Sequence, residues 1–285
     1  MKKIYLKEMF FHVTHVCNLT CENCDSYNNR NFKGHLFWKD YEDYYIEWSK
    51  KLDVDTINLI GGEPFANPKL IDWVNQVSKY FTSTKNFRIS TNGTYIQNNI
   101  DLAIEIINKG FSFDVCVHDP ALRNSIELSI NKISALINAT KVVNGSVTNY
   151  ILNDRNVIKL YNTYVFFKAS TEKIENKITF FRRSDPVKAH DLCMQECGPS
   201  HFFMKGKIYK CYLTAIASDL TNQFQFEQEG ADLLNSYVPA DPFDSEDKLV
   251  QFFNEIQTYI KQCQLCAERK IIKPIWPLSK SKVKF

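Results

Sequence analysis

Residues 17–24 are Cys-Asn-Leu-Thr-Cys-Glu-Asn-Cys, so that Cys17, Cys21 and Cys24 stand in a C-x3-C-x2-C pattern. They directly follow an apolar run, residues 10–16, which is typical of a buried strand. Three thiolates this close together can hold three irons of a cubane iron–sulfur cluster. Such a cluster normally takes four protein ligands, so the pattern leaves one iron open to another molecule.

The same three cysteines also suit a zinc site or plain buried thiols. Structural zinc usually has four protein ligands, and the histidines near the pattern are His12, His15 and His35. The motifs further along the chain favour the iron–sulfur cluster over both alternatives.

Length and composition narrow the class of protein. With 285 residues, the chain can bury a full core in one large domain or in two. A net charge of +3, from 35 basic and 32 acidic residues, is too balanced to indicate a nucleic-acid or membrane partner. We find no run long enough for a membrane span and no signal peptide. The nine cysteines, clustered and odd in number, indicate metal binding in a reducing compartment, so we expect a cytoplasmic protein.

The first half of the chain alternates short β runs with amphipathic helices. We expect strands at residues 9–16, 56–60, 87–91 and 113–117, and helices that begin near Asp40, Asn67, Asp101 and residue 121. This alternation predicts an α/β fold with a parallel sheet and outer helices, either open or barrel-like. Two more strands are expected near residues 163–167 and 178–181, while residues 141–160 fit no element clearly.

The alternation ends at Ser184-Asp185-Pro186, and cysteines become frequent again beyond it. We therefore predict a boundary between a first domain at residues 1–185 and a second, smaller, cysteine-rich domain at residues 186–285. In the second domain, apolar positions between residues 249 and 260 predict a helix whose end delivers Cys263.

Candidate ligand-binding residues follow the predicted strands, as is usual in barrel-like parallel folds. The second strand is followed by Gly61-Gly62-Glu63-Pro64, where the glycines allow a close approach of the backbone and Glu63 offers a carboxylate. The third strand ends in Ser90-Thr91-Asn92-Gly93, with Ser90 and Asn92 on one face. Each segment alone could be a simple turn.

The fourth strand places Asp114, Cys116 and His118 on one face. His118 is at the carboxyl end of this strand, where its ring could point into the mouth of a barrel. A structural histidine is an equally good interpretation. Cys116 is isolated in the sequence and is better explained as a buried thiol.

The cysteine pattern, the Gly-Gly-Glu-Pro segment and the polar end of the third strand together resemble the radical S-adenosylmethionine (SAM) superfamily. The resemblance implies an enzyme with a partial (β/α)6 barrel, in which Cys17, Cys21 and Cys24 bind a [4Fe-4S] cluster. In that family, SAM chelates the open iron, and an electron from the cluster cleaves SAM to methionine and a 5′-deoxyadenosyl radical.

The resemblance also implies roles for the strand ends. Gly61, Gly62, Glu63 and Pro64 would hold the amino group of SAM, and Ser90, Asn92 and His118 would lie near its carboxylate, its ribose or the substrate. The family usually has an aromatic residue near the adenine, just before the third cysteine. This sequence has Asn23 there.

A second set of cysteines lies beyond residue 190, at Cys193, Cys197, Cys211, Cys263 and Cys266. Its spacing resembles the SPASM and twitch extensions of radical SAM enzymes, which hold auxiliary iron–sulfur clusters. Five cysteines are enough for one auxiliary [4Fe-4S] cluster, with one cysteine surplus. A zinc ribbon is the alternative, because paired cysteines also bind zinc.

We therefore expect an oxidoreductase-type radical SAM enzyme that abstracts hydrogen from a peptide or protein side chain. Oxidation of a small metabolite such as a sugar alcohol is the alternative enzyme. A non-catalytic zinc- or iron-binding protein is the alternative from another class. The resemblance implies an electron donor such as flavodoxin or ferredoxin, and an auxiliary cluster that accepts an electron from the substrate or binds the substrate. The sequence indicates no oligomeric state.

Overall fold

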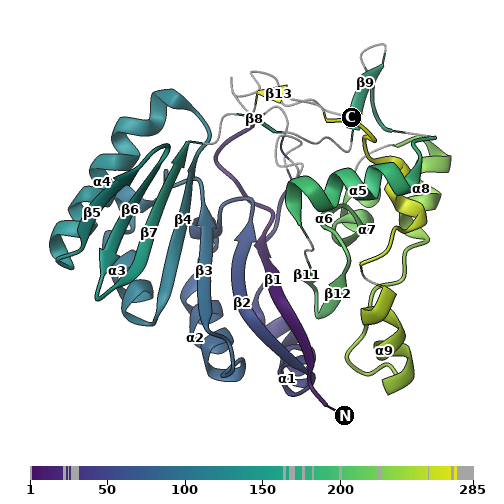
Figure 1. The fold of residues 1–285 in the computed structure, drawn as a ribbon, viewed down its shortest axis with the longest axis horizontal. Helices are drawn as coiled ribbons and strands as arrows, with labels where there is room; N and C mark the ends of the chain where they lie inside the picture. Colours follow the sequence, from purple (N-terminus) through teal and green to yellow (C-terminus); the bar gives the residue numbers. More distant parts are fainter. Residues whose placement is uncertain are drawn as a thin grey trace.

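A nine-stranded sheet forms the centre of the molecule, in the order β12-β11-β1-β2-β3-β4-β7-β6-β5 (Figure 1). The computed structural model describes residues 2–21, 24, 26, 32–162, 165–166, 171–174, 177–181, 183–198, 201–223, 226–255, 257–270 and 273–274. The parallel strands at the centre of the nine-stranded sheet are β1 (Ile4–Thr14), β2 (Leu52–Gly61), β3 (Asn86–Thr91), β4 (Phe111–Val117) and β7 (Arg155–Asn162).

Each edge of this parallel core is extended by a hairpin. On one side, β11 (His201–Met204) pairs parallel to β1, and β12 (Lys207–Tyr209) pairs antiparallel to β11. On the other side, β5 (Thr140–Asn144) and β6 (Val147–Leu152) form an antiparallel hairpin next to β7. Two small sheets lie apart, one of β9 (Thr171–Ile174) and β10 (Lys177–Phe180), the other of β8 (Val165–Phe166) and β13 (Lys273–Pro274).

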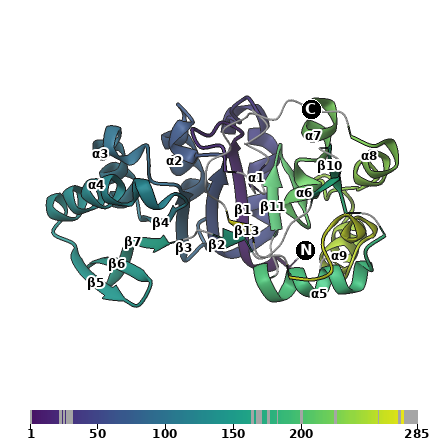
Figure 2. The same ribbon diagram turned by 90° about the horizontal axis from the view of Figure 1, so that it is seen from above.

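Helices cover one face of the sheet (Figure 2). These are α1 (Glu42–Lys51), α2 (Leu70–Tyr80), α3 (Ile100–Asn108) and α4 (Arg123–Leu136). The later helices lie beyond the β11 edge: α5 (Pro186–Cys197), α6 (Tyr212–Ala215), α7 (Ala217–Gln223), α8 (Gln228–Asn235) and α9 (Glu246–Glu255). Single 3-10 turns occupy Trp38–Tyr41, Pro64–Ala66, Ile96–Asn98, Pro120–Leu122 and Lys261–Leu265. Within these ranges, no helix has the length and apolar character needed to cross a membrane.

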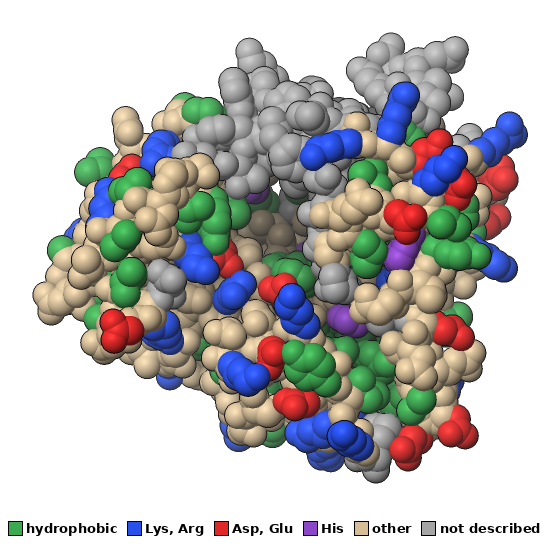
Figure 3. Space-filling model, in the orientation of Figure 1, with side chains coloured by type: hydrophobic (Ala, Val, Ile, Leu, Met, Phe, Trp, Pro, Cys, Tyr) green, Lys and Arg blue, Asp and Glu red, His purple; other side chains and the backbone are tan. Residues whose placement is uncertain are grey.

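The opposite face of the sheet carries polar side chains. Arg88 lies between two carboxylates, with its Nη1 4.0 Å from Glu8 Oε1 and 3.9 Å from Asp114 Oδ2. Tyr161 donates a hydrogen bond to Asp114 Oδ1 at 3.5 Å. The Arg88 side chain is 33% exposed, so solvent reaches this face. Figure 3, which views the molecule from this side, shows a hollow near its centre.

The structure confirms the predicted α/β fold with a partial barrel. The strands expected at residues 56–60, 87–91 and 113–117 lie within β2, β3 and β4, and a helix follows each of them. The largest difference in a helix start is that of α2, which begins at Leu70; the Asn67 side chain caps the preceding turn by accepting a hydrogen bond from Lys69 N at 2.8 Å.

The predicted fifth and sixth strands are wrong as members of the main sheet. The described part of residues 163–167 is β8, and residues 178–181 largely overlap β10; both belong to the small sheets. The fifth parallel strand in chain order is β7. It begins within residues 141–160, the stretch to which the sequence assigned no element, and ends just beyond it. Its Val157, Ile158 and Leu160 are buried, whereas the preceding β5 is exposed along most of its length. The exposed hairpin conceals the core strand in the sequence pattern.

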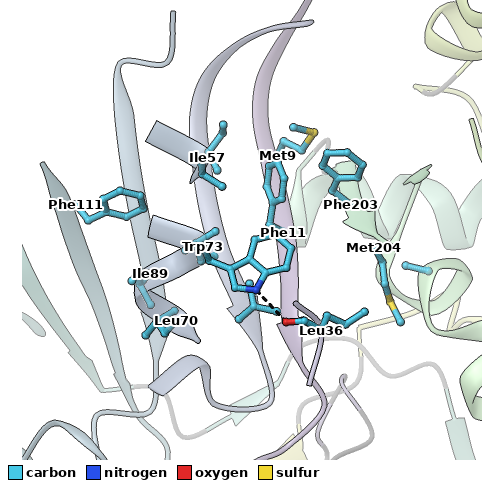
Figure 4. Packing of buried hydrophobic residues seen from close by; sticks show 14 of the residues in the cluster. Met9, Phe11, Leu36, Ile57, Leu70, Trp73, Ile89, Phe111, Phe203 and Met204 are labelled. Carbon is cyan, nitrogen blue, oxygen red and sulfur yellow. Dashed lines mark hydrogen bonds between the residues drawn. The ribbon is translucent and has the colours of Figure 1, made fainter. Parts of the chain in front are cut away.

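The hydrophobic core packs around Phe11 of β1 (Figure 4). Its ring centroid lies 4.6 Å from that of Phe203 on β11 and 6.2 Å from that of Trp73 on α2. The Trp73 indole donates to Leu36 O at 2.9 Å, so its buried N–H is satisfied. Since Phe203 belongs to the C-terminal region, both sheet and core continue across the boundary expected at residue 185. The domain division itself stays a prediction.

Gly206 fixes the β11–β12 turn against α1. Its φ is +76°, and a Cβ there would stand 2.7 Å from the Cβ of Tyr44. Its carbonyl accepts a hydrogen bond from the Trp48 indole at 2.9 Å. The turn therefore needs glycine both for its backbone conformation and for space.

We predict that Gly206→Ala destabilises the protein far more than Gly145→Ala. Gly145 also has a positive φ, in the β5–β6 turn, but a Cβ there would contact nothing within 4 Å. In the control, backbone strain should lower the free energy of unfolding by about 1 kcal/mol. In Gly206→Ala, overpacking should lower it by about 1–3 kcal/mol more. Urea unfolding measures both. Equal losses would show that the contact with α1 is unimportant.

Candidate functional site

The carboxyl ends of β1, β2, β3 and β4 meet at one edge of the sheet. The cysteine loop that follows β1 lies against the other three. Asn92, just after β3, donates from Nδ2 to Cys17 Sγ at 3.7 Å, and Nδ1 of His118, just after β4, lies 3.6 Å from Cys21 Sγ. The structure thus brings together four of the predicted site residues, Cys17, Cys21, Asn92 and His118.

Gly61 and Gly62 pack against the chain that leads into the cysteine loop. Gly62 N donates to Thr14 O, and Glu63 N donates to Val16 O, both at 2.8 Å. A Cβ on Gly61 would stand 2.4 Å from Thr14 O, and one on Gly62 would stand 2.4 Å from Val16 O. The close approach that the glycines allow is therefore to the protein's own backbone. Their contact with SAM stays a prediction.

Glu63 is fully buried and ties β2 to β3. Its Oε1 accepts hydrogen bonds from Thr91 Oγ1 at 2.6 Å and from Phe65 N at 3.1 Å, and its Oε2 accepts from Asn92 N at 2.7 Å. Pro64, also buried, begins the 3-10 turn that Glu63 caps. Burial raises the pKa of Glu63 to about 7, although the three hydrogen bonds oppose this rise.

The other predicted SAM contacts have protein partners of their own. The Asn92 amide also donates to Asn18 Oδ1 at 3.1 Å, which holds the cysteine loop against β3. Ser90 pairs with Asn58 on β2, with a hydrogen bond of 3.0 Å from Asn58 Nδ2. Burial lowers the pKa of His118 to about 4, so its imidazole is neutral at pH 7.

Burial disfavours the thiolate form of the cysteines in the loop. Burial, with a smaller contribution from the neighbouring Cys24, raises the pKa of Cys17 above its usual range and that of Cys21 to about 12. Across the described ranges, no three His, Cys, Asp or Glu side chains are arranged to hold a metal ion. In a cubane each thiolate binds a separate iron, and the positive iron favours the thiolate form. Asn23 lies outside the described residues.

The second cysteine set comes from three elements. Cys193 is on α5, Cys211 precedes α6, and Cys263 lies in the 3-10 turn Lys261–Leu265, not at the end of a helix as expected. Burial raises the pKa of Cys263, and the nearby Cys211 and Cys193 raise it further. Cys266 is buried and its N–H donates to Cys263 O at 3.0 Å. The side chain of Cys197, the last residue of α5, lies outside the described part.

A chain of polar side chains links the two cysteine regions. Tyr212 OH lies 3.1 Å from His12 Nδ1, and His12 Nε2 lies 3.0 Å from His15 Nδ1. His15 Nε2 then lies 3.1 Å from Asp219 Oδ2, and Lys205 Nζ donates to Asp219 Oδ1. Sequence reasoning considered the histidines only as zinc ligands and missed Asp219 altogether. Partners some 200 residues apart leave no local signal in a single sequence.

We predict that Asp219→Asn lowers the free energy of unfolding by about 2 kcal/mol at pH 7. Burial by itself would raise the pKa of Asp219, but the hydrogen bonds from His15 and Lys205 lower it to about 2. Because the folded pKa is depressed, the stabilisation is present above pH 4 and is lost as the pH falls toward 2. The matched control is Asp232→Asn on the exposed face of α8, which should change stability little. Urea unfolding across pH 3–7 tests this, and a pH-independent difference would contradict it.

We predict the opposite pH dependence for Glu63. Its folded pKa is raised, so its contribution to stability is full below pH 4 and is lost as the pH rises through 7. Glu63→Gln should therefore gain stability relative to the parent between pH 5 and 8, by up to about 3 kcal/mol. Glu105→Gln, on the exposed face of α3, is the control. Thermal unfolding in a pH series measures the difference, and a constant offset would refute the assignment.

Comparison with known proteins places the chain in a class. Residues 11–159, more than half of the sequence, match the model of the radical SAM superfamily. The chain therefore belongs to the radical SAM superfamily. It is an enzyme of SAM-dependent radical chemistry, which uses SAM and a [4Fe-4S] cluster. No curated protein matches the sequence.

Among solved structures, BtrN in complex with AdoMet and 2-DOIA is similar over 95% of this chain and 100% of its own, with 15% identity and a TM-score of 0.52. At 15% identity, this similarity shows a shared fold and nothing further. BtrN in an open conformation matches 42% of this chain and 53% of its own, with 22% identity and a TM-score of 0.33. SuiB of Streptococcus suis, bound to S-adenosylmethionine, matches 46% of this chain and 38% of its own, with 14% identity and a TM-score of 0.29.

Proposed function

We propose that Cys17, Cys21 and Cys24 bind the cluster on which SAM is reductively cleaved, and that the enzyme then abstracts a hydrogen atom from its substrate. The observation that carries this assignment is the contact of Cys17 with Asn92 and of Cys21 with His118, which sets the loop over the strand ends. When bound, SAM and the cluster supply a 5′-deoxyadenosyl radical.

The protein's own residues shape this site. We assign Gly61, Gly62, Glu63 and Pro64 to the amino group of SAM, and Ser90, Asn92 and His118 to its carboxylate or ribose. Asn92 has the double role of positioning the cysteine loop and presenting a polar edge to the ligand. Since Ser90 already pairs with Asn58, a bond from Ser90 to SAM would replace that pair. The neutral His118 can donate or accept a hydrogen bond without introducing a charge.

A peptide or protein side chain is the substrate that we propose first, in an oxidoreductase-type reaction. The polar face with Glu8, Arg88 and Asp114 is open to solvent, and these residues precede the carboxyl ends of β1, β3 and β4, where the cysteine loop lies. A side chain of a larger molecule can enter there while its backbone remains outside. The second candidate is a small polar metabolite such as a sugar alcohol. It is favoured by the full-length similarity to BtrN, which was solved with the small ligand 2-DOIA.

We also propose that the C-terminal region binds one auxiliary [4Fe-4S] cluster, as a twitch-like domain, and that the cluster takes part in substrate oxidation or substrate binding. Its ligands would come from Cys193, Cys197, Cys211, Cys263 and Cys266. The proposal is supported by the proximity of Cys263 to Cys211 and Cys193, which add to the effect of burial in raising the pKa of Cys263. It is also supported by Lys210, whose buried ammonium lies near these cysteines. No described residue accepts a hydrogen bond from this ammonium.

The electron that starts the reaction would come from a small redox protein such as flavodoxin or ferredoxin. We retain a cytoplasmic location as a proposal, because a chain with eight of its nine cysteines in two sets suits a reducing compartment.

Anaerobic reconstitution tests both clusters. The parent protein should bind about eight irons, and the variant with Cys17, Cys21 and Cys24 replaced by Ala should keep about four. That variant should produce no 5′-deoxyadenosine under dithionite, since it lacks the thiolates that hold the SAM cluster. Cys116→Ala, which removes a cysteine outside both sets, is the control and should keep about eight irons.

Two results would contradict these assignments. Undiminished 5′-deoxyadenosine from the triple variant would exclude Cys17, Cys21 and Cys24 as the ligands. One zinc and no iron in the triple variant would exclude the auxiliary cluster and make the C-terminal region a structural zinc module.

A further inference from the structure

Lys210 is a buried cation with no hydrogen-bond partner for its Nζ among the described residues. It follows β12 directly, and only 8% of its surface is exposed. No described residue accepts a hydrogen bond from its Nζ. Its backbone N–H donates to Tyr237 OH at 3.0 Å, which fixes the chain at this point. A buried ammonium is strongly unfavourable unless negative charge and hydrogen-bond acceptors compensate it.

The other lysines of the same hairpin do have carboxylate partners. Lys205 pairs with Asp219, and Lys207 Nζ lies 3.4 Å from Asp241 Oδ2. Lys210 differs, because the groups that act on its charge are cysteines. Burial lowers the pKa of Lys210, and Cys263, Cys211 and Cys193 oppose that effect in this order. Of the three lysines, Lys210 is therefore the one whose charge lies near Cys263, Cys211 and Cys193 and not near a described carboxylate.

A cluster at these cysteines would supply what Lys210 lacks. Four thiolates around a [4Fe-4S]²⁺ core carry a net charge of −2, and reduction by one electron makes it −3. The sulfur atoms of such a cluster also accept hydrogen bonds, and both the net charge and these bonds set its reduction potential. A nearby cation stabilises the reduced state more than the oxidised state, since the reduced state is more negative.

We propose that Lys210 is the positioning cation of the auxiliary cluster: its ammonium donates to the cluster sulfurs and raises the reduction potential of the cluster. The inference rests on the auxiliary cluster of the proposed function and deepens it. A raised potential favours a cluster that accepts an electron over one that only binds substrate.

The test uses the variant with Cys17, Cys21 and Cys24 replaced by Ala, so that only the C-terminal cluster remains. EPR-monitored redox titration then compares Lys210→Met, Lys210→Arg and the control Lys207→Met. At the potential where the parent cluster is half reduced, Lys210→Met should lower the ratio of reduced to oxidised cluster at least tenfold, which is 59 mV for one electron. Lys210→Arg should keep the ratio within threefold, and Lys207→Met should leave it unchanged.

The outcomes distinguish a failure of the role of Lys210 from a failure of the auxiliary cluster itself. Iron retained with an unchanged ratio in Lys210→Met would overturn the role of Lys210 and leave the auxiliary cluster intact. If the variant with Cys17, Cys21 and Cys24 replaced by Ala and Lys210 intact binds no iron, both the auxiliary cluster and the role of Lys210 are overturned. If Lys210→Met fails to bind iron, Lys210→Gln is compared with Lys210→Arg. The need for a cation is supported if Lys210→Gln, but not Lys210→Arg, loses its iron or shows a tenfold lower ratio of reduced to oxidised cluster. Loss in both, or unchanged behaviour in both, overturns it.

Discussion

The site depends on the close backbone contact between the Gly61-Gly62 turn and the end of β1. Two hydrogen bonds of 2.8 Å, from Gly62 N and Glu63 N, set the chain just before Cys17 against the turn after β2. Any side chain at either glycine would meet a carbonyl oxygen at 2.4 Å. The buried Glu63 then extends this constraint to β3, through Thr91 and Asn92. The cysteine loop is consequently positioned by backbone geometry before any cofactor contributes.

The second constraint is the junction of the two cysteine regions. Phe203 shares the core of the first half of the chain, and Tyr212, His12, His15 and Asp219 form a hydrogen-bonded series from one region to the other. Such buried polar series are stable only when every member is satisfied. The distance and orientation between the two sets of cysteines are therefore determined by the protein fold, and neither region can shift without breaking part of the series.

Sequence reasoning recovered the features that local pattern encodes. The first four strands, their helices and the cysteine loop follow from periodicity and spacing, and the meeting of Cys17, Asn92 and His118 follows from the rule that parallel strands present their carboxyl ends at one edge. Sequence reasoning did not predict features that depend on burial or on contacts between residues far apart in the chain. β7 was hidden by an exposed hairpin, and the contact of Gly61 and Gly62 with β1 was not foreseen. Lys210 and Asp219 became notable only through their burial and their distant partners.

The parallel pairing of β11 with β1 has a consequence for the evolution and engineering of the chain. A gene fragment ending at the presumed boundary would leave β1, the strand that leads into the cysteine loop, as an unprotected sheet edge, with Phe11 uncovered on one side. Open edges of this kind recruit other chains and aggregate. The C-terminal region therefore cannot be removed without exposing this edge, and a C-terminal region taken from a relative would need a strand equivalent to β11 that pairs with β1.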